Sequence, residues 1–275
     1  MVLTECRVNI IGIAPKSGGA NSFHFTQLSE SEIFLPISDS NNILIQAMSD
    51  DDWSKLAPFV SRSELGHRQL LVAANSPIEI IYFLEGGIAS VVARNDSGEQ
   101  TEVGIFGREG FSAAPVLLGN AQTPHDTFMQ VDGGAALTID AAHLREAVNA
   151  SRTLRDLLLR YINTFMIQTA SSVVSNAHHS IETRLARWLL MCHDRTDGDD
   201  IFLTHEFMAM MIAAQRSGVT LTLHVLEGYG AIKSSRGKVT VKDRSLLEKA
   251  AGDSYGPPEA CYRETIAPFG KSIRN

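Results

Sequence analysis

The stretch EFMAMMIAAQRSGVTLTLHVLEGYGAI, residues 206–232, contains two amphipathic segments separated by a short break at 212–214. The second segment starts with Gln215, Arg216 and Ser217, where a buried helix would carry leucine or isoleucine. An arginine and a hydroxyl at the start of a helix with apolar later turns indicate that this end faces a partner outside the protein. The apolar residues that can pack the two segments together are Phe207, Met211, Ile212, Val219, Leu223 and Leu226.

Two packed helices joined by a short turn predict a helix-turn-helix, which places the start of its second helix in the major groove of DNA. Arginine can donate two hydrogen bonds to guanine, and hydroxyl groups can bond bases or phosphates. The free backbone N–H groups at a helix start also favour phosphate. We therefore expect Gln215, Arg216, Ser217 and Thr220 to contact DNA. An ordinary helical hairpin with a solvated corner has the same local pattern and remains an alternative.

The flanking segments extend this motif. An amphipathic segment, IETRLARWLLMCH at 181–193, and the short β segment in DRTDGDDIFLT precede it, and AIKSSRGKVTVKD at 231–243 predicts a hairpin after it. This order of elements is typical of a winged helix-turn-helix, to which we assign residues 179–251. Arg236 and Lys238 would contact phosphates from the wing. The remaining residues, 252–275, are assigned to a C-terminal tail.

A long helix is predicted over residues 151–177 from an apolar stripe. At 1.5 Å per residue it would be about 40 Å long, which is more than one small barrel can cover. We expect a dimerisation helix at 151–178 that pairs with its copy in a second subunit, and packing within one chain is the alternative. The residues expected at this interface are Leu154, Leu158, Tyr161 and Phe165.

Residues 41–150 contain short β-rich runs, which predict a small antiparallel barrel or sandwich rather than βαβ units. A helical piece is expected around Ile43–Phe59, where SDDDW provides an acidic N-terminal cap, and Asp140 can cap a helix over AAHLREAV. Hairpins are expected at Glu85-Gly86-Gly87, at Asn95-Asp96-Ser97-Gly98 and at Asp132-Gly133-Gly134.

The formal net charge of −7 over 275 residues seems to argue against nucleic-acid binding, but the charge is unevenly distributed. Residues 213–244 hold six basic and two acidic side chains, whereas residues 41–150 hold six basic and 14 acidic ones. Exposed charges more than about 10 Å apart are largely screened by salt, so a basic patch on an acidic body can still bind DNA. Residues 1–40 lack sustained periodicity and are expected to form a poorly ordered extension.

Several classes of protein find no support in the sequence. No apolar run approaches a membrane span and the start is weak as a secretory signal, so a cytoplasmic protein is expected. The cysteines Cys6, Cys192 and Cys261 are too far apart for a disulfide framework or a zinc or iron–sulfur site. The pair His178-His179 is expected at the surface rather than in a metal site.

Catalysis and cofactor binding are not expected either. The glycines Gly104, Gly107 and Gly110 lack the spacing of a dinucleotide fingerprint and are expected in turns of the barrel. No nucleophile stands beside a paired base. We therefore expect neither an enzyme nor a resident cofactor.

From about residue 41 to residue 253 the sequence resembles the Crp/Fnr family of bacterial transcription regulators, most clearly in IETRLARWLL, LTHEFMAMMIAAQRSGVTLTLHVLEGYGAI and SSRGKVTVKD. The resemblance implies an α+β chain with an N-terminal antiparallel, jelly-roll-like β-roll effector domain at 41–150, a dimerisation helix and a winged helix-turn-helix. It also implies a homodimer on a roughly palindromic double-stranded operator, RNA polymerase as a partner, and an unidentified small-molecule effector.

The resemblance further implies that Arg216 reads the operator, because it matches an arginine that does so in the family. The chain departs from the family pattern at Ala213, where the turn usually has glycine, and at Gly218, where serine or threonine is usual. These two differences affect the expected base preference more than the fold.

Nucleotide-binding members of the family carry a Gly-Glu pair for the ribose and an arginine followed by serine or threonine for the cyclic phosphate. Here Ser112-Ala113 and His125-Asp126 align with those pairs. Asp126 would repel a phosphate and a neutral His125 replaces a guanidinium poorly, so we expect an effector domain that does not bind a cyclic nucleotide. A regulator responsive to cAMP or cGMP is the alternative. An alternative of another class is a ligand-binding or protein-interaction module with a vestigial helix-turn-helix.

Overall fold

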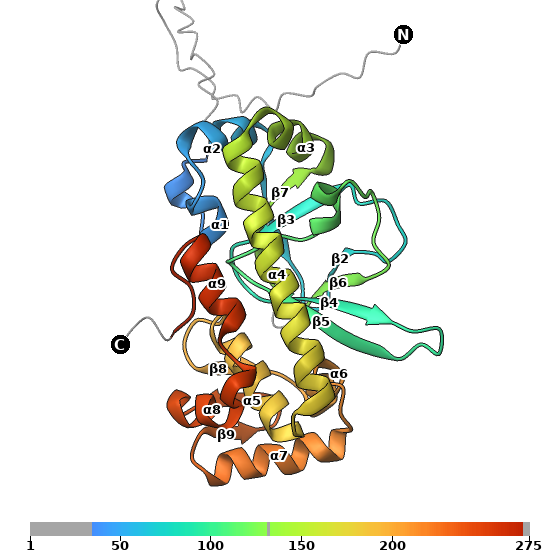
Figure 1. The fold of residues 1–275 in the computed structure, drawn as a ribbon, viewed down its shortest axis with the longest axis vertical. Helices are drawn as coiled ribbons and strands as arrows, with labels where there is room; N and C mark the ends of the chain where they lie inside the picture. The colour runs from blue at the N-terminus through green and yellow to red at the C-terminus, as the bar shows by residue number, and fades with distance from the viewer. Residues whose placement is uncertain (1–34, 131–132, 272–275) are drawn as a thin grey trace, which may run out of the picture. The chain divides into compact units, whose positions relative to one another are not determined.

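A computed structural model of the chain describes residues 35–130 and 133–271 (Figure 1). Most of the extension expected at 1–40 therefore lies outside the described residues. Residues 35–40 belong to the packed part of the chain, because Trp53 Nε1 donates a 2.8 Å hydrogen bond to the carbonyl of Leu35. None of the described helices combines the length and the hydropathy that crossing a membrane requires.

The helical piece expected around 43–59 consists of three short elements, α1 (Ile43–Gln46), α2 (Asp50–Leu56) and the 3-10 turn η2 (Ala57–Phe59). Ser49 interrupts the helix because it adopts an extended backbone conformation and caps α2, accepting a 3.1 Å hydrogen bond from the Asp52 N–H. Three acidic residues in the first turn of α2 also suit the positive end of the helix dipole. The N-terminal signal in SDDDW is therefore confirmed.

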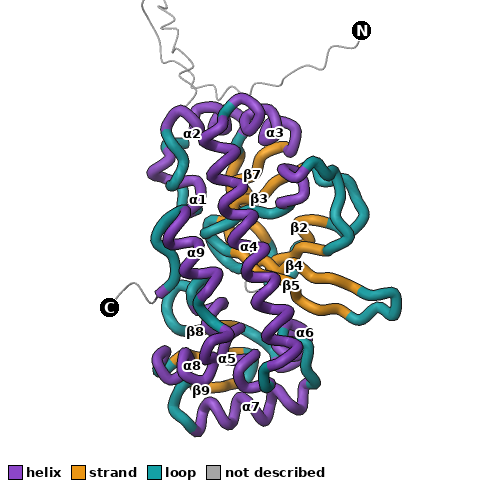
Figure 2. The backbone as a smooth tube through the Cα atoms, in the orientation of Figure 1, coloured by secondary structure: helices purple, strands orange, loops and turns teal. Residues whose placement is uncertain are grey.

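The N-terminal β-roll consists of two antiparallel sheets, which confirms the predicted fold class (Figure 2). One sheet has the order β1-β7-β3, and the other has the order β2-β6-β4-β5. The strands are β1 (Ser61–Leu65), β2 (Leu70–Val72), β3 (Ile80–Leu84), β4 (Ala89–Arg94), β5 (Gln100–Phe106), β6 (Asp126–Met129) and β7 (Gly134–Asp140).

The turn at 95–98 forms the predicted hairpin, with Arg94 opposite Gln100. The hairpin predicted at 85–87 is wrong, because that segment joins β3 to β4 in the other sheet. The turn predicted at 132–134 also connects strands of different sheets, β6 and β7, and its Asp132 lies outside the described residues. The β3–β4 and β6–β7 connections, which both join the two sheets, pass close together, since a Cβ on Gly87 would lie 2.2 Å from the Gly133 carbonyl oxygen. These glycines permit a close backbone approach.

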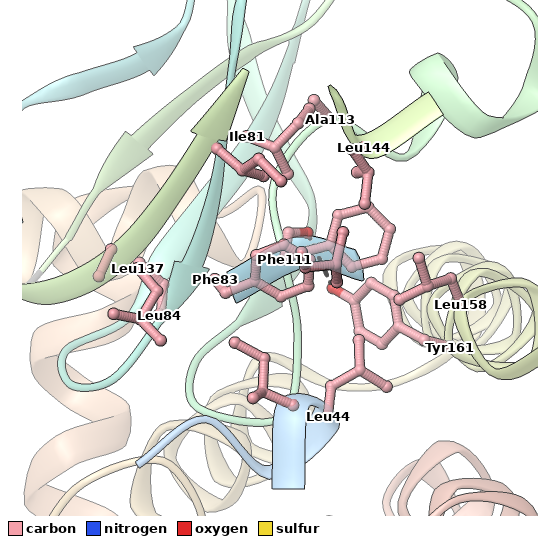
Figure 3. Close-up of a cluster of buried hydrophobic side chains, with 14 of the residues drawn as sticks. Leu44, Ile81, Phe83, Leu84, Phe111, Ala113, Leu137, Leu144, Leu158 and Tyr161 are labelled. Carbon is pink, nitrogen blue, oxygen red and sulfur yellow. Dashed lines mark hydrogen bonds between the residues drawn. The ribbon is translucent and has the colours of Figure 1, made fainter. Parts of the chain in front are cut away.

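The core of the β-roll lies between the sheets and the helices that cover them. Figure 3 shows Phe111 between Phe83 and Tyr161, and the ring centroids of these two lie 5.3 Å and 5.0 Å from that of Phe111. Helix α3 (Ala141–Ala150) contributes the fully buried Leu144. Asp140 stands at the N-cap of α3, but its side chain accepts no capping hydrogen bond.

The predicted long helix is α4 (Arg152–His178), which is capped by Ser151 (Figure 1). It packs directly on β5 and on the turn that follows, because Gly104 and Gly110 leave room for the rings of Phe165 and Tyr161. A Cβ at Gly104 would lie 2.7 Å from Phe165, and one at Gly110 would lie 2.3 Å from the Tyr161 hydroxyl. Gly104 lies within a strand, so its expected place in a turn is wrong.

The residues predicted to form a dimer interface on α4 pack against the β-roll of the same chain. Leu154, Leu158 and Tyr161 are buried in the β-roll core, and Phe165 packs against it. Because Leu154, Leu158 and Tyr161 are buried, a second subunit cannot contact them, and the prediction that they form the dimer interface is wrong. The larger apolar residues of α4 lie on the side that the β-roll covers. Met166 and Val173 of α4 are exposed.

The C-terminal elements follow the predicted order and end in a small antiparallel sheet, β8-β10-β9. Trp188 and Leu223 lie in a second hydrophobic core that holds these elements together. The elements are α5 (Ile181–His193), β8 (Asp200–Phe202), α6 (His205–Met211), α7 (Arg216–Gly228), β9 (Ile232–Ser235), β10 (Lys238–Val241) and α8 (Arg244–Ala251).

The segment assigned to a C-terminal tail contains the 3-10 turn η4 (Gly252–Ser254) and a packed helix, α9 (Pro257–Thr265), that lies beside α4 (Figures 1 and 2). Tyr262 is almost fully buried, and its hydroxyl donates a 2.8 Å hydrogen bond to the Glu109 carbonyl of the β-roll. The sequence signal for this helix is Pro257-Pro258, because proline is favoured in the first turn.

Candidate DNA-binding surface and ligand cavity

Helices α6 and α7 are joined by a tight turn at 212–214. Thr204 caps α6 by accepting a 3.1 Å hydrogen bond from the Phe207 N–H. In the turn, Ala213 adopts a left-handed conformation with φ of 50°. This conformation costs an L-residue about 1–2 kcal/mol. The chain therefore keeps the turn geometry without the glycine that would relieve its strain.

The start of α7 is open to solvent, as the sequence predicted. Gln215, Arg216 and Ser217 are exposed, and the Gln215 side chain makes no capping hydrogen bond. Arg216 Nη1 lies 3.7 Å from Glu206 Oε1, and the two side chains are 67% and 75% exposed. An ion pair this exposed contributes at most about 1 kcal/mol, so the Arg216 guanidinium can leave it for another partner.

The hydroxyl of Thr220 is less available for a DNA contact than its position in the sequence predicts. Its hydroxyl donates a 3.1 Å hydrogen bond to the Arg216 carbonyl and lies 2.9 Å from His205 Nδ1 of α6. The threonine therefore helps to hold α7 to α6. Leu221 occupies the outward position in this turn of α7 and was not among the residues predicted to contact DNA. Its spacing of four residues from Ser217 is the signal that could have identified it.

The two cations of the wing, Arg236 and Lys238, differ in exposure and in their contacts. Arg236 is exposed at the turn between β9 and β10. Lys238 is partly exposed, and its Nζ lies 2.8 Å from Asp200 Oδ2 on β8. Hydrogen bonds from Lys238 and Thr240 lower the pKa of Asp200, so this carboxylate is charged at neutral pH and holds the lysine. Arg236 is thus the freer of the two wing cations proposed to contact phosphates.

A cavity of about 570 Å³ lies between the β-roll and α4. Mostly apolar side chains of the β-roll, among them three valines and two phenylalanines, form one side of its wall, and Ile162, Phe165 and Met166 close it from α4. None of the residues that line it is Asp, Glu, Lys or Arg. This wall cannot be predicted from the sequence, because the residues that form it come from distant parts of the chain.

Of the four residues expected in an effector pocket, Ala113 and His125 line this cavity, whereas Ser112 and Asp126 do not. Ser112 is fully buried, and its hydroxyl accepts a 3.0 Å hydrogen bond from the Tyr82 N–H. Asp126 accepts a 2.9 Å hydrogen bond from the Ala74 N–H and lies 3.3 Å from Arg94 Nη2. Within β6 (Asp126–Met129), Thr127 lines the cavity and Asp126 does not, because successive side chains point to opposite faces of a sheet.

One polar atom in the cavity wall has no hydrogen-bond partner among the described residues. His125 Nδ1 is buried, and no hydrogen bond to it is formed by the described residues. A buried polar atom left unpaired costs about 1–3 kcal/mol. A ligand that bonds to this nitrogen would remove that cost.

The expected surface pair, His178 and His179, is split by the end of α4. His178 is exposed, and His179 is half-buried with its Nε2 3.5 Å from Asp253 Oδ1. Within residues 35–130 and 133–271, no three side chains of the His, Cys, Asp or Glu type are grouped to hold a metal ion.

Comparison with known proteins extends these observations. Residues 183–250 match the family model described as the Crp-like helix-turn-helix domain. The Global nitrogen regulator of a Nostoc species is 26% identical over 181 residues, which cover 63% of this chain and 81% of that protein.

Two solved structures share the fold at low identity. A transcriptional regulator of the Crp/Fnr family from Eubacterium rectale has a TM-score of 0.60 and 15% identity, with 76% of this chain and 97% of that chain covered. FixK2 from Bradyrhizobium japonicum has a TM-score of 0.60 and 12% identity, with coverages of 70% and 98%.

Proposed function

We propose that the chain is a transcription regulator of the Crp/Fnr type, and that it acts as a homodimer that binds a specific double-stranded DNA operator; the match of residues 183–250 to the Crp-like helix-turn-helix domain supports this proposal. The observation that carries the proposal is the exposed start of α7, with Gln215, Arg216 and Ser217 directed away from a buried helix pair. Binding to the chromosome requires that the protein act in the cytoplasm of a bacterium, where RNA polymerase is its partner in transcription.

In this proposal Arg216 is the main base-reading residue. Its guanidinium lies in an exposed contact with Glu206 and can form two hydrogen bonds with guanine in the major groove. Ser217 and Gln215 lie beside it, and the backbone N–H groups that begin α7 favour a phosphate. Arg236, and Lys238 once released from Asp200, would contact phosphates from the wing.

A homodimer is supported by a stripe of exposed residues on α4, which borders the face of the helix that the β-roll covers. Their spacings alternate between four and three, as in the contact stripe of a coiled coil. The stripe is apolar except for one asparagine, and a single asparagine in such a seam can fix the register of two helices. The six residues, all exposed, are Leu159, Asn163, Met166, Ala170, Val173 and Ala177.

Two-fold pairing along this stripe would place the two copies of α7 on one side of a duplex. The operator is then roughly palindromic, and its half-sites are about 34 Å apart, one turn of the duplex. This spacing follows from the dimer and is independent of the base preference of Arg216.

The chemistry of the cavity favours an uncharged, mostly apolar effector over a cyclic nucleotide. A bound cyclic phosphate needs a fixed positive charge or several donors, and no lysine or arginine lines the cavity. The unpartnered His125 Nδ1 would bond to a single polar group of the ligand. Because Met166 and Ala170 belong both to the cavity wall and to the dimer stripe, such a ligand would also contact the helix that joins the subunits.

Isothermal calorimetry tests this choice. We expect no heat of binding for cAMP or cGMP at micromolar concentrations. A micromolar dissociation constant for either nucleotide would show that the effector assignment is wrong and would favour a regulator responsive to cyclic nucleotides.

Selection of binding sites from genomic fragments tests the proposed function as a whole. The purified protein is mixed with sheared DNA, and the retained fragments are sequenced. We expect the retained fragments to share a palindromic motif that Arg216→Ala does not enrich. If the wild-type protein retained no promoter DNA, the chain would be a ligand-binding or interaction module with a vestigial helix-turn-helix.

A further inference from the structure

Leu221 is an apolar side chain in an unusual position. It is 68% exposed, the highest value among the large hydrophobic side chains of the described residues. It lies on the side of α7 opposite the buried Val219 and Leu226, one turn after Ser217. Isolated apolar residues are common on protein surfaces, so it is the position of Leu221, rather than its exposure, that indicates a role.

The position of Leu221 is that of a base-contacting residue if α7 enters DNA as proposed. The first turns of the second helix of a helix-turn-helix lie in the major groove. Ser217 and Leu221 share the outward side of these turns, whereas Thr220 is held by His205. The side chain most exposed to a base edge in the second turn is therefore hydrophobic.

We propose that Leu221 recognises a thymine through its C5-methyl group. This inference rests on the proposed function, because it requires α7 to lie in the major groove. Leucine can neither donate nor accept a hydrogen bond, and among the four bases only thymine presents an apolar group at the major-groove edge. Other bases would lose water from a polar edge without gaining a partner, which adds to the preference for thymine.

The proposal also predicts where the thymine lies. Leu221 follows Arg216 by five residues, or about 7.5 Å along the axis of α7. Because base pairs are stacked about 3.4 Å apart, this distance places the thymine within about two base pairs of the guanine read by Arg216. Each half-site of the operator would then contain a guanine and a thymine at a fixed spacing.

The test removes the methyl group alone, by replacing each thymine of a selected operator with deoxyuridine. Wild-type binding should weaken at one thymine of each half-site, by about fourfold per half-site for the loss of one buried methyl group. Leu221→Ala should bind the unmodified operator more weakly and lose its sensitivity to deoxyuridine at that same position. Leu221→Met should keep the sensitivity, because its side chain remains apolar and long.

A matched control is Tyr229→Ala, which removes another exposed side chain at the far end of α7. This variant should show the same deoxyuridine penalty as the wild type. The proposal is overturned if no thymine is sensitive to deoxyuridine, or if the penalty persists in Leu221→Ala.

The failure of this inference can be distinguished from failure of the proposed function. If the wild type binds the operator specifically and Arg216→Ala abolishes that preference, the proposed function holds even when deoxyuridine has no effect. If the wild type shows no preference for any DNA, both proposals are overturned together.

Discussion

The indole Nε1 of Trp188 on α5 donates a 2.8 Å hydrogen bond to Oε1 of Glu102 on β5. Both side chains are buried, and Oε2 of Glu102 accepts hydrogen bonds of 2.7 Å from Ser90 and 3.0 Å from Gln130. Burial raises the pKa of Glu102 to about 7, in spite of the hydrogen bonds from Ser90 and Trp188 that favour the carboxylate. A titratable group thus lies where the β-roll meets the DNA-binding elements.

This carboxyl group should make stability depend on pH. Its pKa in the folded chain lies above the ordinary value of 4.5, so between these values the folded chain holds a proton that the unfolded chain releases. The contribution of Glu102 to the free energy of unfolding is therefore full below about pH 4.5 and falls as the pH rises to about 7. Relative to Glu102→Gln, the wild type should lose about 2–3 kcal/mol across this range.

Urea unfolding at pH 5 and pH 8 measures the effect. The control is Glu99→Gln, an exposed residue on the turn before β5, which should follow the wild-type pH profile. Parallel profiles for the wild type and Glu102→Gln would contradict the raised pKa.

A second buried contact joins the β-roll to the end of α5. Arg195 Nη2 and Glu109 Oε1 lie 2.7 Å apart, and both side chains are nearly inaccessible. Removing one partner leaves a buried charge unpaired, so Arg195→Ala should lower the free energy of unfolding by about 3–5 kcal/mol. Arg108→Ala breaks a pair of similar length with Asp197, which is 86% exposed, and should cost less than about 1 kcal/mol. Equal losses in urea unfolding would show that burial of the first pair is unimportant.

The dimer stripe can be tested with a pair of matched substitutions. Met166→Glu places a charge in the stripe, where it would be buried against the same residue of the partner or its neighbours, and should convert a dimer to a monomer in light scattering. Leu221→Glu introduces the same charge at a similarly exposed apolar position, 68% against 62% for Met166, but outside α4. It should leave the mass unchanged. A dimeric Met166→Glu protein would place the subunit contact elsewhere.

The helix-turn-helix could be predicted from the sequence because its signals are local. Polar residues at the start of α7 and apolar periodicity along it lie within one stretch. The role of Thr220 could not be predicted, because it depends on His205, 15 residues away in the sequence. Helical spacing likewise showed that Leu158 is buried but not that the β-roll, rather than a second subunit, covers it.

Long-range pairing explains the remaining differences. The glycines at 86–87 have the composition of a hairpin turn, yet the strands on either side join different sheets. Helix α9 begins with two prolines after a glycine, a pattern that indicates a break as readily as a helix start. Its burial depends on α4 and Glu109, about a hundred residues or more earlier in the chain.

The central claim is that Arg216 reads a base in a specific operator. The most direct measurement is the ratio of affinities for operator and scrambled DNA, taken for wild type, Arg216→Ala and Arg236→Ala at several salt concentrations. Arg216→Ala should lose about 1–3 kcal/mol per half-site on the operator and little on scrambled DNA. Arg236→Ala should weaken both DNAs alike and lower the salt slope by about one unit. If Arg216→Ala weakened both DNAs equally, Arg216 would only hold phosphate, and the account of α7 as the base-reading helix would be contradicted.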